Sequence, residues 1–292
     1  MFKKLLFSFV IVLLFTSCSL ENKEKLRISA TTWIGYTPLF YAKEKGWLEP
    51  LNIKLLNVVS LSENMYLYKA GNADAYVGTQ YEYNFLANTT NSLIPVILFD
   101  KSNGGDVVMG NLDIEEFQNK NTPIDVYLEM DSINSILFEE FIKKYNLQNK
   151  QFNYINKDQA FISRLSNLEN PTIIITYVPY NISLEKHGFK ELASTKNNPD
   201  LLIVDALFMQ KDKFLQNRET FIELKKLIDK SITNLENDPK EFYQTINSYL
   251  PDTNYEEFMK SLDDIIWLNK DIPEKTIEKL SNHNLPTRDI IK

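Results

Sequence analysis

The chain has 292 residues and a formal net charge of −7, with Asp+Glu 39 against Lys+Arg 32. This length is enough for one large or two medium domains that bury a core without disulfides. The hydrophobic share of 43% and charged share of 24% exclude a mainly disordered or collagen-like chain. The acidic balance argues against a nucleic-acid partner, which selects a basic surface. The single cysteine, Cys18, excludes a multi-cysteine metal site.

The N-terminus is typical of an export signal. Two lysines precede an apolar run over residues 5–15, and small residues lead to Cys18. The run is shorter than the ~20 residues of a membrane span. Residues 15–18 resemble a bacterial lipobox, which implies cleavage of residues 1–17 as a lipoprotein signal peptide, lipid on Cys18, and anchoring to a bacterial membrane in the periplasm or at the cell surface. A plain secretory signal with an incidental cysteine is the alternative. Residues 18–25 read as a polar tether.

Strands and helices alternate through the first two thirds of the chain. Thr37 and Pro38 suit the N-cap and first position of a helix that ends near Gly46. From residue 214 the pattern is helical to the end. The alternation predicts an α/β fold with parallel sheets. We expect strands over 26–31, 53–59, 74–79, 93–99, 124–128, 152–155, 172–176 and 201–208, and further helices over 63–70, 132–145 and 158–168.

Signatures of catalysis are mostly missing. There is no phosphate-binding glycine loop with its lysine, no nucleophile elbow and no His-Glu-x-x-His helix. His187 is expected at a helix C-terminus, and His283 lies in a polar tail. We therefore expect no enzyme activity, no catalytic residue, no metal and no cofactor, although catalysis by a pair of carboxylates stays open.

Residues 30–39 bring together a strand end, a turn at Gly35 and a helix start, whose free amides can hold an anion. Trp33 and Tyr36 flank the glycine and either wall a site or belong to the core. The strand over 74–79 and the strand over 172–176 are each followed by a tyrosine-rich segment. This repeated pattern is either a coincidence in a tyrosine-rich chain or an indication of two lobes whose strands end at a shared cleft.

Residues 33–46, with an aromatic residue, Gly-Tyr, Pro-Leu and Ala-Lys-x-x-Gly, resemble the start of nitrate/sulfonate/taurine-type substrate-binding proteins of ABC importers. Segments 69–79, 100–106, 175–180 and 200–207 are similar to further motifs of that family. The resemblance implies the type II periplasmic binding protein fold, in which each of two lobes is a mostly parallel sheet flanked by helices. Residues 26–108 would form lobe 1, 109–203 lobe 2, and 204–292 the return to lobe 1 with the C-terminal helices.

The resemblance also implies a function. A small organic solute, sulfonate- or taurine-like or a pyrimidine-like vitamin precursor, would bind between the lobes of a monomer and be delivered to an ABC permease and its ATPase. Asp106 and Asp205 would be hinge residues or receive a ligand amine. A sensor lipoprotein without an importer, or a vitamin-precursor enzyme on the same fold, are the alternatives. The expected ligand contacts are Trp33, Gly35, Tyr36, Thr37, Gln80, Tyr81, Ser132, Ser135, Tyr177 and Tyr180.

Overall fold

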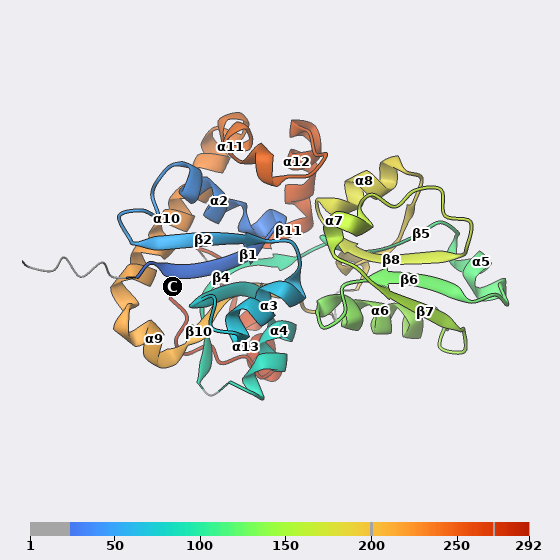
Figure 1. The fold of residues 1–292 in the computed structure, drawn as a ribbon, viewed down its shortest axis with the longest axis horizontal. Coiled ribbons are helices and arrows are strands. Elements are labelled where there is room, and N and C mark those ends of the chain that lie inside the picture. Colours follow the sequence, from blue (N-terminus) through green and yellow to red (C-terminus); the bar gives the residue numbers. More distant parts are fainter. Residues whose placement is uncertain (1–23, 91, 199–200, 271, 292) are drawn as a thin grey trace, which may run out of the picture.

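The computed structural model describes residues 24–90, 92–198, 201–270 and 272–291. The predicted signal peptide, Cys18 and most of the tether lie outside these residues. The described chain forms two lobes side by side, each built on one sheet (Figure 1). Within the described residues, no helix is long and apolar enough to cross a membrane.

Lobe 1 contains a sheet with the strand order β11-β4-β10-β3-β1-β2. β1 is parallel to β2 and β3, whereas β10 is antiparallel to β3 and β4, and β11 is antiparallel to β4. The prediction of an all-helical end was wrong at β11, which is too short to show a strand period. The strands are β1 (Leu26–Thr31), β2 (Ile53–Val58), β3 (Ala75–Thr79), β4 (Leu93–Ser102), β10 (Val204–Gln210) and β11 (Ile265–Trp267).

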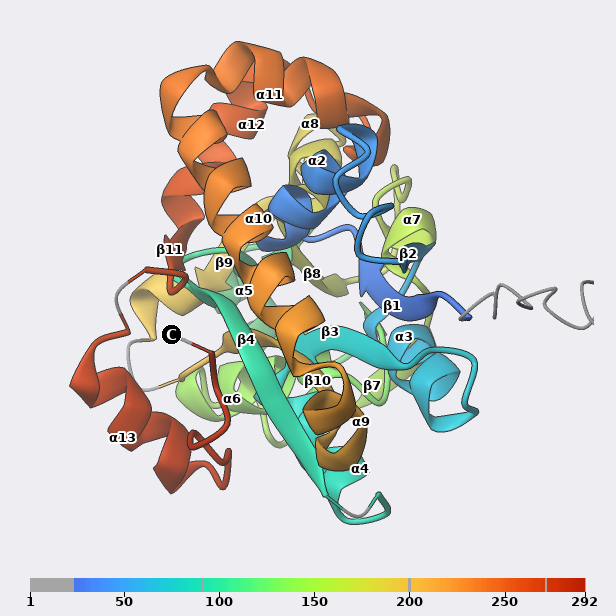
Figure 2. The ribbon, with the colours of Figure 1, turned by 90° about the vertical axis from the view of Figure 1, so that its left-hand side faces the viewer.

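Helices cover both faces of this sheet. α2 contacts α10 and α11, and Tyr41 stacks on Phe242 with ring centroids 4.4 Å apart. Figure 2 shows α10 and α11 (orange) and α13 (red) on different sides of β4. The helices are η1 (Ile34–Tyr36), α2 (Thr37–Glu44), α3 (Leu61–Lys69), α4 (Gln80–Ala87), α9 (Lys211–Gln216), α10 (Arg218–Asn237), α11 (Pro239–Ile246), η3 (Asn247–Tyr249), α12 (Tyr255–Ser261), η4 (Leu262–Asp264) and α13 (Glu274–Asn282).

Lobe 2 contains a sheet with the order β7-β6-β8-β5-β9. The predicted helix over 158–168 is only α7, and Asn167 beyond it has φ 52, a left-handed conformation that a helix does not contain. The strands are β5 (Asp106–Gly110), β6 (Ile124–Leu128), β7 (Phe152–Asn156), β8 (Thr172–Tyr177) and β9 (Lys190–Ser194). The helices are α5 (Ile114–Asn119), α6 (Ile133–Lys144), α7 (Gln159–Ile162), α8 (Tyr180–Lys186) and η2 (Thr195–Asn197).

The chain crosses between the lobes after β4 and again between β9 and β10. The expected lobe boundary at 108/109 is too late, because β5 pairs with β8 and β9 of lobe 2 from Asp106 onward. The return strand β10 begins at Val204. Both sheets are mixed rather than mostly parallel, because β10 in lobe 1 and β5 in lobe 2, which each follow a crossover, run antiparallel to both of their neighbours, and β11 runs antiparallel to β4. At the first crossover, a Cβ on Gly105 would lie 2.5 Å from the Trp33 ring, so the close approach requires glycine.

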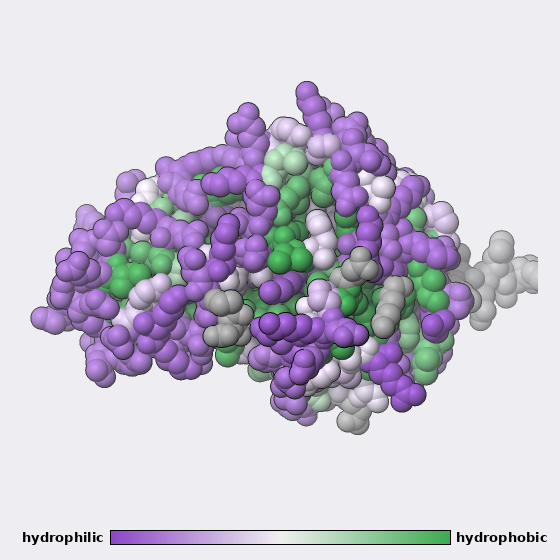
Figure 3. Space-filling model, turned by 180° about the vertical axis from the view of Figure 1, so that it is seen from behind, coloured by the Kyte–Doolittle hydropathy of each residue, from purple (hydrophilic) through white to green (hydrophobic). Residues whose placement is uncertain are grey.

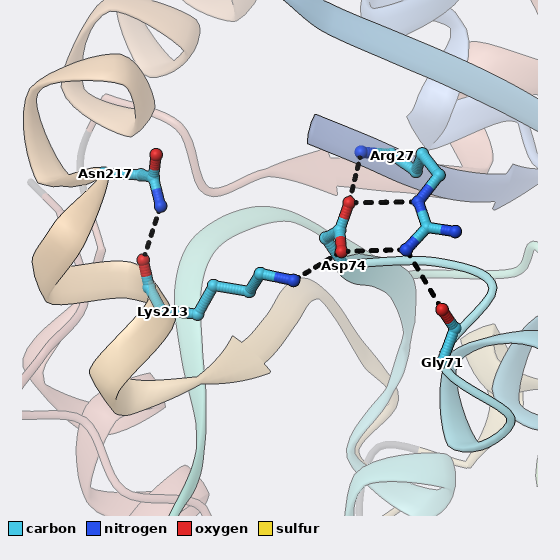
Figure 4. A network of polar contacts seen from close by, with 5 residues as sticks. All are labelled: Arg27, Gly71, Asp74, Lys213 and Asn217. Carbon is cyan, nitrogen blue, oxygen red and sulfur yellow. Dashed lines mark hydrogen bonds and ion pairs between the residues drawn. The ribbon is translucent and has the colours of Figure 1, made fainter. Parts of the chain in front are cut away.

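A buried acid ties the end of lobe 1 together (Figure 4). Asp74 accepts hydrogen bonds from the Arg27 backbone N–H at 2.8 Å, from the Arg27 guanidinium at 3.1 and 3.2 Å, and from Lys213. Burial alone would raise the pKa of Asp74, but the bonds from Arg27 and Lys213 outweigh it and lower that pKa to about 2. The face seen from behind is mainly hydrophilic, with patches of hydrophobic residues between the hydrophilic ones (Figure 3).

Candidate functional site

A small cavity lies between the lobes, where strands of both sheets end. It measures about 10 Å³, which is room for about one water molecule. Side chains from both lobes line it, so any occupant touches both. The lining residues are Trp33, Tyr36, Leu61, Thr79 and Asp205 from lobe 1, and Asp106, Ile133 and Tyr177 from lobe 2.

Aromatic rings form one wall of the cavity. Trp33 packs edge-on against Tyr177 across the lobe interface, with ring centroids 5.8 Å apart, and Tyr180 packs against Tyr177 at 5.5 Å. Tyr180 also shares a side-chain hydrogen bond with Thr32 of lobe 1. These contacts make the interface between the lobes partly aromatic.

Carboxylates hold the side chains of Trp33 and Tyr36 in place. The Trp33 indole Nε1 donates to both oxygens of Asp100, at 3.1 and 3.2 Å, and the Tyr36 hydroxyl donates to Asp205. A Cβ on Gly35 would lie 1.8 Å from Asp100 Oδ2. Gly35 is therefore needed for the Trp33–Asp100 contact, whereas the sequence suggested a ligand contact at this glycine.

Buried acids concentrate around the cavity. Asp100 and Glu82 are fully buried, and Glu129, Asp106 and Asp205 are no more than 3% exposed. Burial raises the pKa of Asp106 to about 7 and that of Glu129 to about 8, and it raises the pKa values of the other three as well. Among the residues that line the cavity, none is basic. The site thus concentrates acids whose charged forms are not balanced by any basic residue among the side chains that line the cavity.

Two of the acids, Glu82 and Glu129, each accept a hydrogen bond from the first backbone amide of a helix in the opposite lobe. We call them the crossed carboxylates. Glu82 of lobe 1 accepts from the backbone N–H of Ile133, the first residue of α6 in lobe 2, at 2.9 Å. Glu129 of lobe 2 accepts from the backbone N–H of Leu61, the first residue of α3 in lobe 1, at 3.0 Å. Glu82 also accepts from Thr79 and Glu129 from Gln159, each in its own lobe. At the starts of α3 and α6, one backbone amide each is therefore already occupied by a carboxylate of the opposite lobe.

Other predicted contacts serve the fold. Thr37 is the first residue of α2 rather than its N-cap, because η1 precedes it, and its hydroxyl donates to the Ile34 carbonyl at 2.7 Å. Gln80 accepts from the Val204 backbone N–H at 2.9 Å, which fixes the start of β10. Ser132 caps α6 and donates to the Glu129 carbonyl.

The last two predicted contacts, Tyr81 and Ser135, are half-buried and are not among the residues that line the cavity. The structure thus brings together at the cavity Trp33, Tyr36 and Tyr177 with Asp106 and Asp205.

Sequence reasoning missed three acids of the site. Asp100 and Glu129 each directly follow an apolar strand segment, and polar residues at strand ends mark ligand sites in α/β sheets. Glu82 stands three residues after Thr79, the spacing of a capping box, which the structure contains. The capping role was readable in the sequence; the second bond of Glu82 to the other lobe was not.

The comparisons with known proteins identify the fold. No protein-family model matches the sequence, and no curated protein is detectably similar to it. Among solved structures, the ligand-binding component of an ABC-type import system from Staphylococcus aureus, with zinc bound, matches with a TM-score of 0.71 at 16% identity, over 92% of this chain and 97% of that one.

Two further solved structures agree. The alkanesulfonate-binding protein SsuA from Xanthomonas axonopodis pv. citri, bound to MOPS, matches with a TM-score of 0.69 at 12% identity, over 91% and 98% of the chains. A Candida albicans gene product with the generic periplasmic binding protein fold matches with a TM-score of 0.66 at 11% identity, over 90% and 96%. The chain therefore has the two-lobed periplasmic binding protein fold that the sequence predicted. Within the described residues, no group of three or more His, Cys, Asp or Glu side chains is arranged to hold a metal ion.

Proposed function

We propose that the chain is an extracytoplasmic, lipid-anchored solute-binding protein of an ABC importer, and that it captures a small organic solute between its lobes. The observation that carries the proposal is the cavity at the lobe interface, which is lined by aromatic and acidic side chains of both lobes. Similar folds in an ABC-import ligand-binding component and in an alkanesulfonate-binding protein support the same role. The proposal includes a monomeric protein that delivers its solute to a permease and needs no cofactor.

Binding would work through lobe closure. A solute that touches Trp33 and Tyr177 has more contacts in the closed form than in the open form, so it shifts the population toward closure. The crossed carboxylates already favour the closed arrangement through two interlobe bonds. The permease would bind the closed form in preference to the open one. No covalent step is involved in the proposed role.

The solute class follows from the lining. We infer that Trp33, Tyr36 and Tyr177 contact the solute, with Asp106 and Asp205 facing its hydrogen-bond donors. A taurine-like solute carries an ammonium group, and a pyrimidine-like vitamin precursor carries an amine, so either could meet these acids. A simple sulfonate or nitrate would meet only carboxylates and tyrosines. The site therefore favours the amine-bearing members of the predicted solutes.

Tryptophan fluorescence tests the cleft directly. The soluble fragment from Ser19 contains Trp33, Trp47 and Trp267, so the double variant Trp47→Phe, Trp267→Phe leaves Trp33 as the reporter. We expect saturable quenching or a spectral shift as a panel of sulfonates, amines, amino acids and pyrimidines is titrated. The matched variant Trp33→Phe, in which Trp47 and Trp267 remain, should lose that response. A solute that binds by calorimetry but leaves Trp33 unchanged would place the binding site elsewhere.

Co-purification with the permease separates transport from sensing. An importer subunit should be retained by the detergent-solubilised permease and ATPase encoded beside it, and it should stimulate ATP hydrolysis when the solute is present. A chain that binds solute but is retained by no such transporter would support the sensor lipoprotein instead.

A further inference from the structure

We propose that the cavity between the lobes receives the protonated primary amine of a small organic solute, held by Asp106, Asp205 and Tyr177. The proposal rests on the proposed binding function and assigns the chemical class of the solute. The group that enters the cavity would be an ammonium head, and the rest of the solute would lie toward the opening lobes.

Unpartnered polar atoms carry the proposal. The Oδ2 atom of Asp106 and the hydroxyl of Tyr177 have no hydrogen-bond partner, although both residues line the cavity and are only 3% and 2% exposed. Buried polar atoms are nearly always paired in folded proteins, so each unpaired one calls for an explanation. An ammonium group has three N–H donors, which suit a carboxylate oxygen and a tyrosine hydroxyl together.

Charge and ring placement favour a cation. Asp106 and Asp205 line the cavity from opposite lobes, and no basic residue is among the lining side chains. Trp33 and Tyr177 add aromatic rings from opposite lobes, and such rings attract ammonium groups when the cation lies over a ring face. A cation placed here would therefore draw both lobes together.

Anions are disfavoured for an independent reason. The helix-start amides of Leu61 and Ile133 already donate to Glu129 and Glu82 of the opposite lobe. A sulfonate or nitrate would reach these two amides only by displacing the carboxylates, and in the cavity it would face Asp106 and Asp205. The protein's own acids thus take the place that an anionic solute would otherwise fill.

The size of the cavity fits the same group. About 10 Å³ is close to the volume that one water molecule needs, and an ammonium group is of similar size. A bulkier trimethylated head does not fit this space and has no N–H to donate. A primary amine therefore suits this cavity better than a quaternary one.

Calorimetric titration of the mature chain with matched probes tests the inference. Ethanolamine, ethylammonium and putrescine supply primary ammonium groups, choline is the trimethylated counterpart of ethanolamine, and 2-hydroxyethanesulfonate is its anionic counterpart. We expect at least one primary amine to bind, and choline and the sulfonate to bind at least tenfold more weakly. Asp106→Asn should weaken amine binding at least tenfold.

Two further variants keep the test decisive if Asp106→Asn fails to fold. Tyr177→Phe keeps the ring and removes a hydroxyl that the fold leaves unpaired, so it should weaken amine binding severalfold without lowering the melting temperature. Asp125→Asn makes the same chemical change as Asp106→Asn on β6, at a carboxylate bound to Asn153 and Asn170, and should leave binding unchanged.

The outcomes separate the two proposals. Binding of the sulfonate, nitrate or another solute without binding of any primary amine would overturn the ammonium site and leave the proposed binding function standing. Equal binding of choline and ethanolamine would overturn the ammonium site as well. Failure of every probe and of the wider solute panel would contradict both proposals.

Discussion

Replacing Asp106 by Asn should make the solute-free protein more stable at neutral and alkaline pH. Asp106 is 3% exposed, its Oδ2 lacks a partner, and Glu82 is the one group that raises its pKa besides burial. Burial, followed in a minor way by the charge of Glu82, raises its pKa to about 7, while the hydroxyl of Ser102 opposes the shift. The amide has the carboxyl's shape but never ionises, so it avoids the cost of a buried charge.

The sign and size of this effect follow from linkage. An acid whose folded-state pKa lies above its unfolded value of about 4 favours folding at low pH, and that contribution is lost as pH rises toward about 7. Each pH unit between the unfolded-state and folded-state pKa values removes about 1.4 kcal/mol from the free energy of unfolding. Between pH 5 and pH 8 the free energy of unfolding of the wild type should therefore fall by about 2 to 3 kcal/mol relative to that of Asp106→Asn.

Urea denaturation of both proteins at pH 5 and pH 8 measures this difference directly. The charge of Asp106 also raises the pKa values of Asp100 and Asp205, so its removal eases their ionisation and adds to the gain of the variant at pH 8. Asp125→Asn serves as the control and should follow the wild type at both pH values. A variant that gains nothing between pH 5 and pH 8 would show that Asp106 is not held in a desolvated, unpaired environment.

Three other substitutions test separate parts of the account. Gly35→Ala puts a methyl group 1.8 Å from the Asp100 carboxylate. We expect it to lower the free energy of unfolding, measured by urea denaturation, by about 1–3 kcal/mol; an unchanged value would refute the close packing. Glu129→Ala removes the interlobe acceptor of the Leu61 amide, which should favour opening by about 1–3 kcal/mol and enlarge the solution-scattering radius; an unchanged radius would refute that role. Cys18→Ala should release the protein from the membrane in detergent partition, and retained attachment would exclude the lipid anchor.

Much of the fold was predictable because its strands and helices follow simple patterns. The segment that became β1 alternates apolar and polar residues, and the segments that became β3, β4 and β8 are mostly apolar. β11 was missed because Ile265–Trp267 becomes a strand only by pairing with the edge of β4. β5 and β9 were not predicted as strands either. The antiparallel direction of β5 and β10 depends on how the chain crosses between the lobes, which the sequence pattern does not show.

The site was predictable only in part. Trp33, Tyr36 and Tyr177 stood out as aromatic residues beside strand ends, and they do line the cavity. The tertiary partners of acids were not readable: nothing in the sequence shows that Asp100 accepts from Trp33 or that Glu129 reaches a helix of the other lobe. From sequence alone, the start of a helix is expected to bind an anion, because the sequence does not show whether a side chain of the protein already accepts from its amides.

The central claim is that the lobes close on a small organic solute, and a thermal-denaturation screen of the mature chain tests it most directly. A solute at ~100 times its Kd stabilises the bound form by about 2.7 kcal/mol, which should raise the melting temperature by roughly 5–10 °C. The account predicts such a rise with one solute class, led by primary amines, and its loss in Asp106→Asn. A flat response across sulfonates, nitrate, amines, amino acids and vitamin precursors, with no solute retained in native mass spectrometry, would contradict it.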